Sequence, residues 1–299
     1  MKVHKQPLLM AFLIVLMMVS ACRGDSGPQP TPVPGNIGTP IPATTEAAAP
    51  LTAADYFARG KLAYDQGDPL AALSDLNKAL ELDGANPEYL YWRGIIHFLT
   101  GNFEGALADF TRTVELNPGN PETHFWRGRV YSYTGRPDEA IANYDVAISL
   151  NDKNPAYFFW RGAAYAYRQE QDPAIADFNR AISLDPNVPD YYHWRGNAYA
   201  FLGNLDQALM DQTRALQLDP NVAVFYFERG RAYAGKGDQA NALLDLNKAI
   251  ELDSGRAEFY LARGLSLKAV GNTDGARQDF QRAAELGSES AAKELAALG

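Results

Sequence analysis

Apolar residues recur through residues 53–290 at spacings of three, four and seven, with polar residues between them. This spacing puts the apolar side chains on one face of an α-helix, so each such segment is predicted to be an amphipathic helix. In segment 103–116, for example, Ala106, Phe110 and Val114 share one face. Glycine and asparagine interrupt the segments at regular intervals, which predicts a series of short helices joined by tight turns.

The helical pattern repeats every 34 residues, most clearly in an Arg-Gly pair that occurs seven times in register. The pairs begin at Arg59, Arg93, Arg127, Arg161, Arg195, Arg229 and Arg263. With repeat one numbered 53–86 and repeat seven 257–290, position 8 is Gly, position 20 is Ala and position 30 is Leu in every repeat. Position 24 is large and apolar except at Gln212. A fixed period of this length indicates stacked units that share one continuous core.

Turn residues divide each repeat into two helices. A Gly-Asp or Gly-Asn pair stands at 67–68, 101–102, 203–204, 237–238 and 271–272. Glycine ends a helix by adopting a left-handed backbone, and Asp or Asn then caps the next helix. Asn-Pro joins successive repeats at 86–87, 120–121 and 154–155, with proline at the first helical position. Repeat four lacks the glycine and has Gln169, Glu170 and Gln171 instead, which predicts a looser or differently built turn.

These positions together resemble the tetratricopeptide repeat family, whose unit is a 34-residue helix–turn–helix. The matching features are Gly at 8, an aromatic residue at 11, Ala at 20 and 27, an aromatic residue at 24 and Pro at 32. The resemblance covers residues 53–290 and implies an all-α fold. It would be an α-solenoid of seven repeats in a right-handed superhelix, with first helices lining a concave groove and a C-terminal capping helix beyond.

The predicted domain organisation has four parts. Residues 1–21 are predicted to be a lipoprotein signal peptide, 22–51 a lipidated cysteine and disordered tether, 52–290 the seven repeats, and 291–299 the capping helix. Thr52 and Asp55 have the spacing of a capping box that opens the first helix. Ala291, Leu295 and Leu298 lie on one stripe, which is predicted to cover the last apolar face.

The N-terminal segment has the features of an export signal. Lys2 and Lys5 precede an apolar run from Leu8 to Val19, which is shorter than the ~20 residues a membrane-spanning helix needs. The run ends in Val-Ser-Ala-Cys, which resembles the lipobox of bacterial lipoproteins and implies that Cys22, the only cysteine, carries acyl chains. Several acyl chains on one residue give stable membrane anchoring. The alternative is an ordinary secretory signal with an incidental cysteine.

Residues 23–50 are rich in Pro, Thr, Ala and Gly and have little apolar material for a core. Such a composition is typical of a disordered or polyproline-like tether, here one that holds the repeats away from a membrane. A proline-rich ligand motif is the alternative. The lipoprotein resemblance implies an extracytoplasmic, lipid-anchored location. Arg23, rather than Asp, after the lipidated residue favours the outer membrane of a two-membrane bacterium, and otherwise the outer face of the plasma membrane is expected.

Aromatic residues concentrate on the first helix of each repeat. All four tryptophans occupy position 6 of repeats two to five, and most repeats have another aromatic residue at position 5. The predicted partner-binding set is Trp92, Trp126, Trp160, Trp194, Phe57, Tyr91, Phe125, Phe159, Phe227, Tyr133 and Tyr167. In the family these positions face the groove, and Tyr64, Phe98 and Phe201 at positions 12 or 13 would extend the aromatic wall. Aromatic anchors dominate many interfaces. The alternative is that the tryptophans only pack between successive helices.

Arginine at position 7 and aspartate at position 23 recur together, one on each helix of a repeat. The predicted structural ion pairs are Arg59–Asp75, Arg93–Asp109, Arg161–Asp177, Arg195–Asp211, Arg229–Asp245 and Arg263–Asp279. Repeat three has Asn143 in place of the aspartate. The pairs could form within a repeat or to the next one, and partly exposed pairs contribute only about 0–1 kcal/mol each. An arginine directed towards a ligand is the alternative.

Charge and side-chain chemistry argue against several functions. The net charge is −9 and no basic stripe occurs, so nucleic-acid binding is not expected. His97, His124 and His193 stand at three different repeat positions without metal-ligand spacing. No nucleophile elbow or phosphate-binding glycine loop is present. The sequence therefore predicts a protein that is not an enzyme and has no metal or other cofactor.

The combined prediction is a membrane-anchored scaffold or adaptor at the cell envelope. It would bind a protein or peptide partner in an aromatic concave groove. The alternative is a lipoprotein that binds cell-wall glycan, because tryptophan and tyrosine faces also stack on sugar rings. Catalytic residues are not predicted in either case.

Overall fold

The structure of the protein is a computed structural model, and it describes residues 50–298. Every regular element in that range is an α-helix. The predicted signal peptide, Cys22 and nearly all of the predicted tether lie outside the described residues. Within residues 50–298, no helix is both long and apolar enough to span a bilayer.

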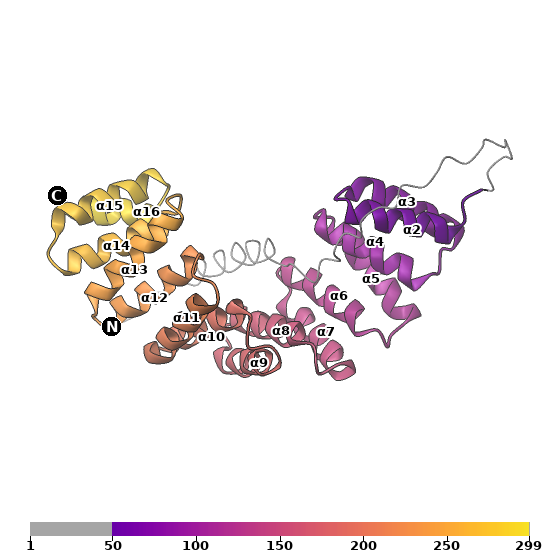
Figure 1. The fold of residues 1–299 in the computed structure, drawn as a ribbon, viewed down its shortest axis with the longest axis horizontal. Coiled ribbons are helices and arrows are strands. Elements are labelled where there is room, and N and C mark those ends of the chain that lie inside the picture. The colour runs from indigo at the N-terminus through magenta and orange to yellow at the C-terminus, as the bar shows by residue number, and fades with distance from the viewer. Residues whose placement is uncertain (1–49, 299) are drawn as a thin grey trace, which may run out of the picture. The chain divides into compact units, whose positions relative to one another are not determined.

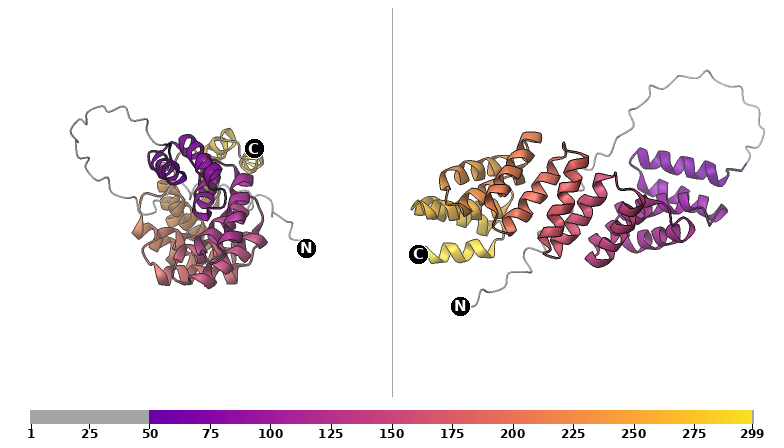
Figure 2. Two further views of the ribbon diagram at one scale, coloured as in Figure 1. Left: turned by 90° about the vertical axis from the view of Figure 1, so that its right-hand side faces the viewer. Right: turned by 90° about the horizontal axis from the view of Figure 1, so that it is seen from below.

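The helices form seven consecutive hairpins, one for each 34-residue repeat (Figures 1 and 2). They are α2 (Ala53–Asp65) with α3 (Pro69–Leu82), α4 (Pro87–Leu99) with α5 (Phe103–Leu116), α6 (Pro121–Tyr133) with α7 (Pro137–Leu150), α8 (Pro155–Tyr167) with α9 (Gln171–Leu184), α10 (Pro189–Phe201) with α11 (Leu205–Leu218), α12 (Ala223–Gly235) with α13 (Gln239–Leu252), and α14 (Ala257–Ala269) with α15 (Thr273–Glu285). The all-α repeat fold predicted from the sequence is therefore confirmed.

The hairpins belong to two compact units, divided after Leu150. In the described chain, the N-terminal unit holds repeats one to three and the C-terminal unit holds repeats four to seven together with α16 (Glu289–Ala297). Within each unit a hairpin packs against the next along the chain, and the first helices of adjacent hairpins also contact one another. Each unit therefore has a face built from first helices and a face built from second helices.

Side-chain caps start the helices where the turn residues predicted them. The Asp55 backbone N–H donates to Thr52 Oγ1 at 3.2 Å, and the Thr52 N–H donates to Asp55 Oδ2 at 2.8 Å, which completes the capping box. Asn86, Asn120 and Asn154 each accept a hydrogen bond from the backbone N–H two residues later, at 3.0–3.1 Å. These caps satisfy donors that have no partner inside the helix.

The turn of repeat four is built like the others, so the prediction of a looser or different turn was wrong. Gln169 has a φ of 64°, in the left-handed region that glycine occupies in the other repeats. The Gln169 N–H donates to the Ala166 carbonyl and the Glu170 N–H to the Tyr165 carbonyl, the same two bonds that Gly67 and Asp68 make in repeat one. Packing of the hairpin thus overrides a backbone cost of roughly 1–2 kcal/mol for a residue with a Cβ.

Small residues let the two helices of each hairpin approach closely. The position-20 alanines are at most 1% exposed in every repeat. A Cβ added at Gly264 would lie 2.6 Å from Cε1 of Phe280, and one added at Gly94 would lie 2.8 Å from Cε1 of Phe110. The ring at position 24 therefore occupies the space that a side chain at position 8 would need. This contact explains why position 8 is Gly wherever position 24 is aromatic.

Repeat five replaces the usual aromatic contact by a buried polar network. Gln212 Oε1 lies 3.1 Å from His193 Nδ1, and Gln212 Nε2 donates to Asn197 Oδ1 at 2.9 Å and to the His193 carbonyl at 3.1 Å. Asn197 Nδ2 lies 3.1 Å from His193 Nε2 and closes the ring of bonds. His193 and Gln212 are both buried. Their polar groups are thus satisfied by one another, as buried polar groups must be.

A final helix covers the end of the C-terminal unit. Ser288 caps α16 by accepting a hydrogen bond from the Ala291 N–H, so the helix starts two residues before the predicted boundary at 291. Ala291, Leu295 and Leu298 pack on the core of repeat seven. This stripe removes from water an apolar face that repeat seven would otherwise expose.

Candidate interaction surface

Six of the seven position-7 arginines form ion pairs inside their own repeats. In repeat two, Arg93 Nε donates to Asp109 Oδ2 at 2.8 Å, and Arg93 Nη2 donates to Asp109 Oδ1 at 2.7 Å. The same two-bond geometry occurs at Arg59–Asp75, Arg161–Asp177, Arg195–Asp211, Arg229–Asp245 and Arg263–Asp279. The bond to Asp109 raises the pKa of the Arg93 guanidinium. These arginines therefore have a structural role, because each joins the two helices of its hairpin.

Several of these guanidinium groups also reach back to the preceding repeat. Arg93 Nη1 donates to Asn77 Oδ1 at 2.9 Å, and Arg263 Nη1 donates to Asn247 Oδ1 at 2.8 Å. In repeat three Arg127 meets an amide instead of a carboxylate, because its Nε donates to Asn143 Oδ1 at 2.7 Å. Burial lowers the pKa of Arg127.

The position-5 rings turn into the hairpins. Phe125 lies 5.9 Å from Tyr144 and Phe159 lies 5.9 Å from Phe178, measured between ring centroids. Phe125, Phe159 and Phe227 are buried, whereas Phe57 and Tyr91 are half-buried. A buried ring has no surface to present to a partner, so these three phenylalanines are core residues in this structure and are left out of the surface defined below.

The position-6 indoles pack across the junction between adjacent repeats. Trp92 lies 5.9 Å from Tyr64 of the preceding repeat, and Trp126 lies 5.4 Å from Phe98, both edge to face. Trp92 and Trp126 are half-buried, and so are Tyr133 and Tyr167. In the C-terminal unit, Trp160 and Trp194 are buried, at 6% and 8% exposure. The tryptophans thus have a packing role, and those of the N-terminal unit also keep surface for contact.

Two cations lie against the half-buried rings of the N-terminal unit. The Lys61 ammonium is 4.5 Å from the centre of the Trp92 ring and 5.5 Å from that of Phe57. The Arg129 guanidinium carbon is 4.9 Å from the Trp126 ring and 5.9 Å from that of Tyr133. Such contacts are attractive because the ring face carries negative electrostatic potential.

We define the aromatic–cationic surface as six residues of α2, α4 and α6 that are not buried. It consists of Phe57, Lys61, Tyr64, Trp92, Trp126 and Tyr133. Tyr91, whose ring centroid lies 6.1 Å from that of Phe110 in its own hairpin, is left out. Leu99, at the same repeat position as Tyr133, is 53% exposed. Most of these rings were predicted from the sequence, but Lys61 was not assigned a role. The sequence contains a basis for including Lys61, because position 9 follows position 6 by three residues and therefore lies on the same helix face.

The histidines are packing residues. His124 is buried, its Nε2 lies 2.9 Å from the Pro118 carbonyl oxygen, and burial lowers its pKa. Burial also lowers the pKa of His97, which lies 4.0 Å from Asp109. Across residues 50–298, no cluster of three or more His, Cys, Asp or Glu side chains is arranged to hold a metal ion.

Family models described as Tetratricopeptide repeat match residues 57–121, 110–142, 189–222 and 223–255, and a model described as TPR repeat matches 128–167 and 162–203. Together these matches cover well over half of the chain. The chain belongs to the tetratricopeptide repeat family. Tetratricopeptide repeats mediate protein–protein interaction and are generally not enzymes, which agrees with a surface made of rings and cations.

Solved tetratricopeptide repeat structures share the fold. A tetratricopeptide repeat protein from Parabacteroides merdae is 22% identical with a TM-score of 0.64, over 82% of this chain and 98% of that one. YrrB, described as a TPR protein with an unusual peptide-binding site, is 23% identical with a TM-score of 0.53, over 62% of this chain and 95% of its own. MamA is 27% identical with a TM-score of 0.51, over 54% and 94%. A search of the curated proteins found no match.

Proposed function

We propose that this tetratricopeptide repeat protein is a scaffold or adaptor that binds a protein segment on the aromatic–cationic surface of repeats one to three. The observation that carries the proposal is the half-buried Lys61 ammonium held over the Trp92 ring. Rings supply apolar contact area at low entropic cost, and a cation held over them favours a partner with a nearby carboxylate. The reported peptide-binding site of YrrB supports this class of ligand by analogy.

The charge at Lys61 provides the sharpest test of this site. We expect Lys61→Glu to reduce capture of the partner at least tenfold in a crosslinked pull-down, because it places a carboxylate where a partner's acidic group would bind. The measurement is quantitative recovery of the captured protein, followed by titration of that protein in purified form. Lys61 makes no carboxylate pair among the described residues, so the change breaks no ion pair and removes only the contacts of the ammonium with the Trp92 and Phe57 rings.

Lys78→Glu is the control for the charge change, because Lys78 is an exposed residue of α3 on the second-helix face and pairs only with Glu81 of its own helix. It should leave capture unchanged. Equal capture by wild type and Lys61→Glu would contradict the site. A tryptophan fluorescence response to soluble wall oligosaccharides, with none to the partner segment, would instead support the glycan-binding alternative.

The membrane anchor is a separate part of the proposal and rests on the sequence around Cys22. We expect Cys22→Ser to move the protein from the membrane fraction to the soluble extracytoplasmic fraction and to abolish incorporation of a labelled fatty acid. The reason is that acyl chains on Cys22 would supply the membrane affinity, since the net charge of −9 does not favour anionic lipid. Unchanged labelling and fractionation of the serine variant would refute lipidation at this residue.

A further inference from the structure

The junctions between repeats one, two and three share a site that the position-6 side chain fills. At the junction of repeats one and two, the Trp92 indole at position 6 lies against Lys61 at position 9 and Tyr64 at position 12 of the preceding repeat. At the next junction, Trp126 lies against Phe98 at position 12 of the preceding repeat. At these two junctions the protein therefore builds a receptor for an indole and occupies it with its own side chain.

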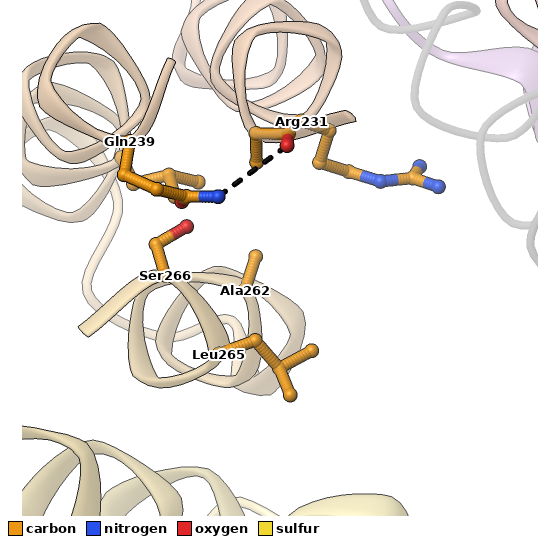
Figure 3. Close-up of a pocket in the computed structure, with 7 residues that line it drawn as sticks. Arg231, Gln239, Ala262, Leu265 and Ser266 are labelled. Atoms are coloured by element: carbon orange, nitrogen blue, oxygen red, sulfur yellow. Dashed lines mark hydrogen bonds between the residues drawn. The ribbon is translucent and has the colours of Figure 1, made fainter. Parts of the chain in front are cut away.

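The junction of repeats six and seven keeps a cation at position 9 but has small residues at positions 6 and 12. Position 6 of repeat seven is Ala262, and position 12 of repeat six is Ala234. Both line a pocket of about 240 Å³, with Arg231 at position 9 on its edge (Figure 3). The volume is below the roughly 300–1,000 Å³ of pockets for drug-sized ligands, so it suits a single side chain. Leu265, also in the lining, is 44% exposed, so the pocket can be reached from solvent.

Polar groups in the pocket select among aromatic side chains. The Gln239 amide nitrogen donates to the Ala234 carbonyl at 3.4 Å, and the Gln239 Oε1 atom is buried with no hydrogen-bond donor among the described residues. Ser266 is buried in the same lining and faces Gln239 in Figure 3. An unsatisfied buried acceptor is costly, and an indole N–H is a donor that a phenyl ring lacks. Arg231 Nη1 already contacts Glu228 at 3.0 Å, so no anionic group is required.

We propose that this pocket binds a tryptophan side chain from a protein partner, and that the Gln239 amide turns so that its Oε1 accepts a hydrogen bond from the indole N–H. The inference rests on the proposed function as a partner-binding protein, and it adds a second anchor in the C-terminal unit. The partner supplies at this junction the ring that repeats two and three supply for themselves. The four tryptophans of the chain pack within repeats two to five, at positions 92, 126, 160 and 194. The indole in this pocket therefore comes from another molecule.

The test uses N-acetyl-tryptophanamide as the probe and the full chain with methyl-labelled alanine. We expect saturable shifts of the Ala234 methyl resonance, with N-acetyl-phenylalaninamide binding roughly tenfold more weakly, the value of one hydrogen bond of about 1.4 kcal/mol. Gln239→Leu should remove this preference for the indole. Ala262→Trp should fill the pocket from within, abolish the shifts and raise the unfolding midpoint, whereas Ala269→Trp, at an exposed site on the same helix, should leave binding intact.

Two results would overturn the proposal. One is equal binding of the two amides to wild type, and the other is an unchanged probe response in folded Ala262→Trp protein. Circular dichroism establishes folding, and Gln239→Leu still tests the pocket if the tryptophan variant does not fold. Because the probe needs no natural partner, a negative result here leaves the Lys61 experiment untouched. Loss of partner capture by the Lys61→Glu variant likewise does not contradict this pocket.

Discussion

Asp109→Ala is expected to lower the free energy of unfolding by about 3 kcal/mol, the lower end of the range for breaking a buried ion pair. Asp109 is 4% exposed and accepts two hydrogen bonds from Arg93. Removal of the carboxylate leaves a half-buried guanidinium that keeps only its bond to Asn77. The lower end applies because Arg93 can turn partly towards water. Urea unfolding followed by circular dichroism measures the change.

Asp109→Asn is the matched control for this prediction. It recreates the Arg127–Asn143 arrangement that repeat three already contains, so its cost should be about 1 kcal/mol. Equal losses for the alanine and asparagine variants would show that the hydrogen bonds to Arg93 contribute little. A change in the slope of the unfolding transition would show instead that the two-state treatment fails for this protein.

Gln212→Leu is expected to lower the free energy of unfolding by a similar amount, about 3 kcal/mol, although leucine also occupies position 24 in repeats one and six. The glutamine satisfies His193 Nδ1, the His193 carbonyl and Asn197 Oδ1 at once. Leucine leaves these groups without that partner, and each unsatisfied buried group costs about 1–3 kcal/mol. Asn197 is half-buried, so water can replace part of its lost hydrogen bonding. The total loss of stability therefore stays below the sum of the separate penalties.

The second substitution His193→Phe should recover most of that loss. The double variant has the phenylalanine and leucine that pack together as Phe227 and Leu246 in repeat six. A double-mutant cycle of urea unfolding then gives a strong favourable coupling between the two substitutions. Strictly additive losses would contradict the view that His193 and Gln212 form one unit.

Periodicity predicted the helices and their ends well, because apolar spacing and caps act locally. It failed at Gln169, where packing of the hairpin imposes a left-handed backbone on a residue that does not favour it. The residue types at positions 7 and 23 predicted ion pairs. Because the pattern is periodic, it cannot distinguish pairing within a repeat from pairing between neighbouring repeats. Only the distances show that Arg59 and Arg93, for example, each pair with the Asp of their own hairpin.

The candidate surface was only partly predictable. Trp126 and Trp160 occupy the same repeat position, yet one is half-buried and the other buried. Position within a repeat sets the direction of a side chain, whereas its exposure depends on how closely neighbouring helices approach, which the pattern does not contain. The pocket beside Ala262 was not predicted, because a small residue on the first helix can leave a cavity that the spacing of large apolar residues does not indicate.

The arginines that hold acceptors from two consecutive repeats have a consequence for how the array responds to ligands. A guanidinium shared in this way makes the order of one hairpin conditional on the order of the one before it. The stability of such an array is a sum over single hairpins and over nearest-neighbour couplings. A ligand that tightens one hairpin therefore also restrains the adjacent ones within its unit, and its effect fades with distance along the chain.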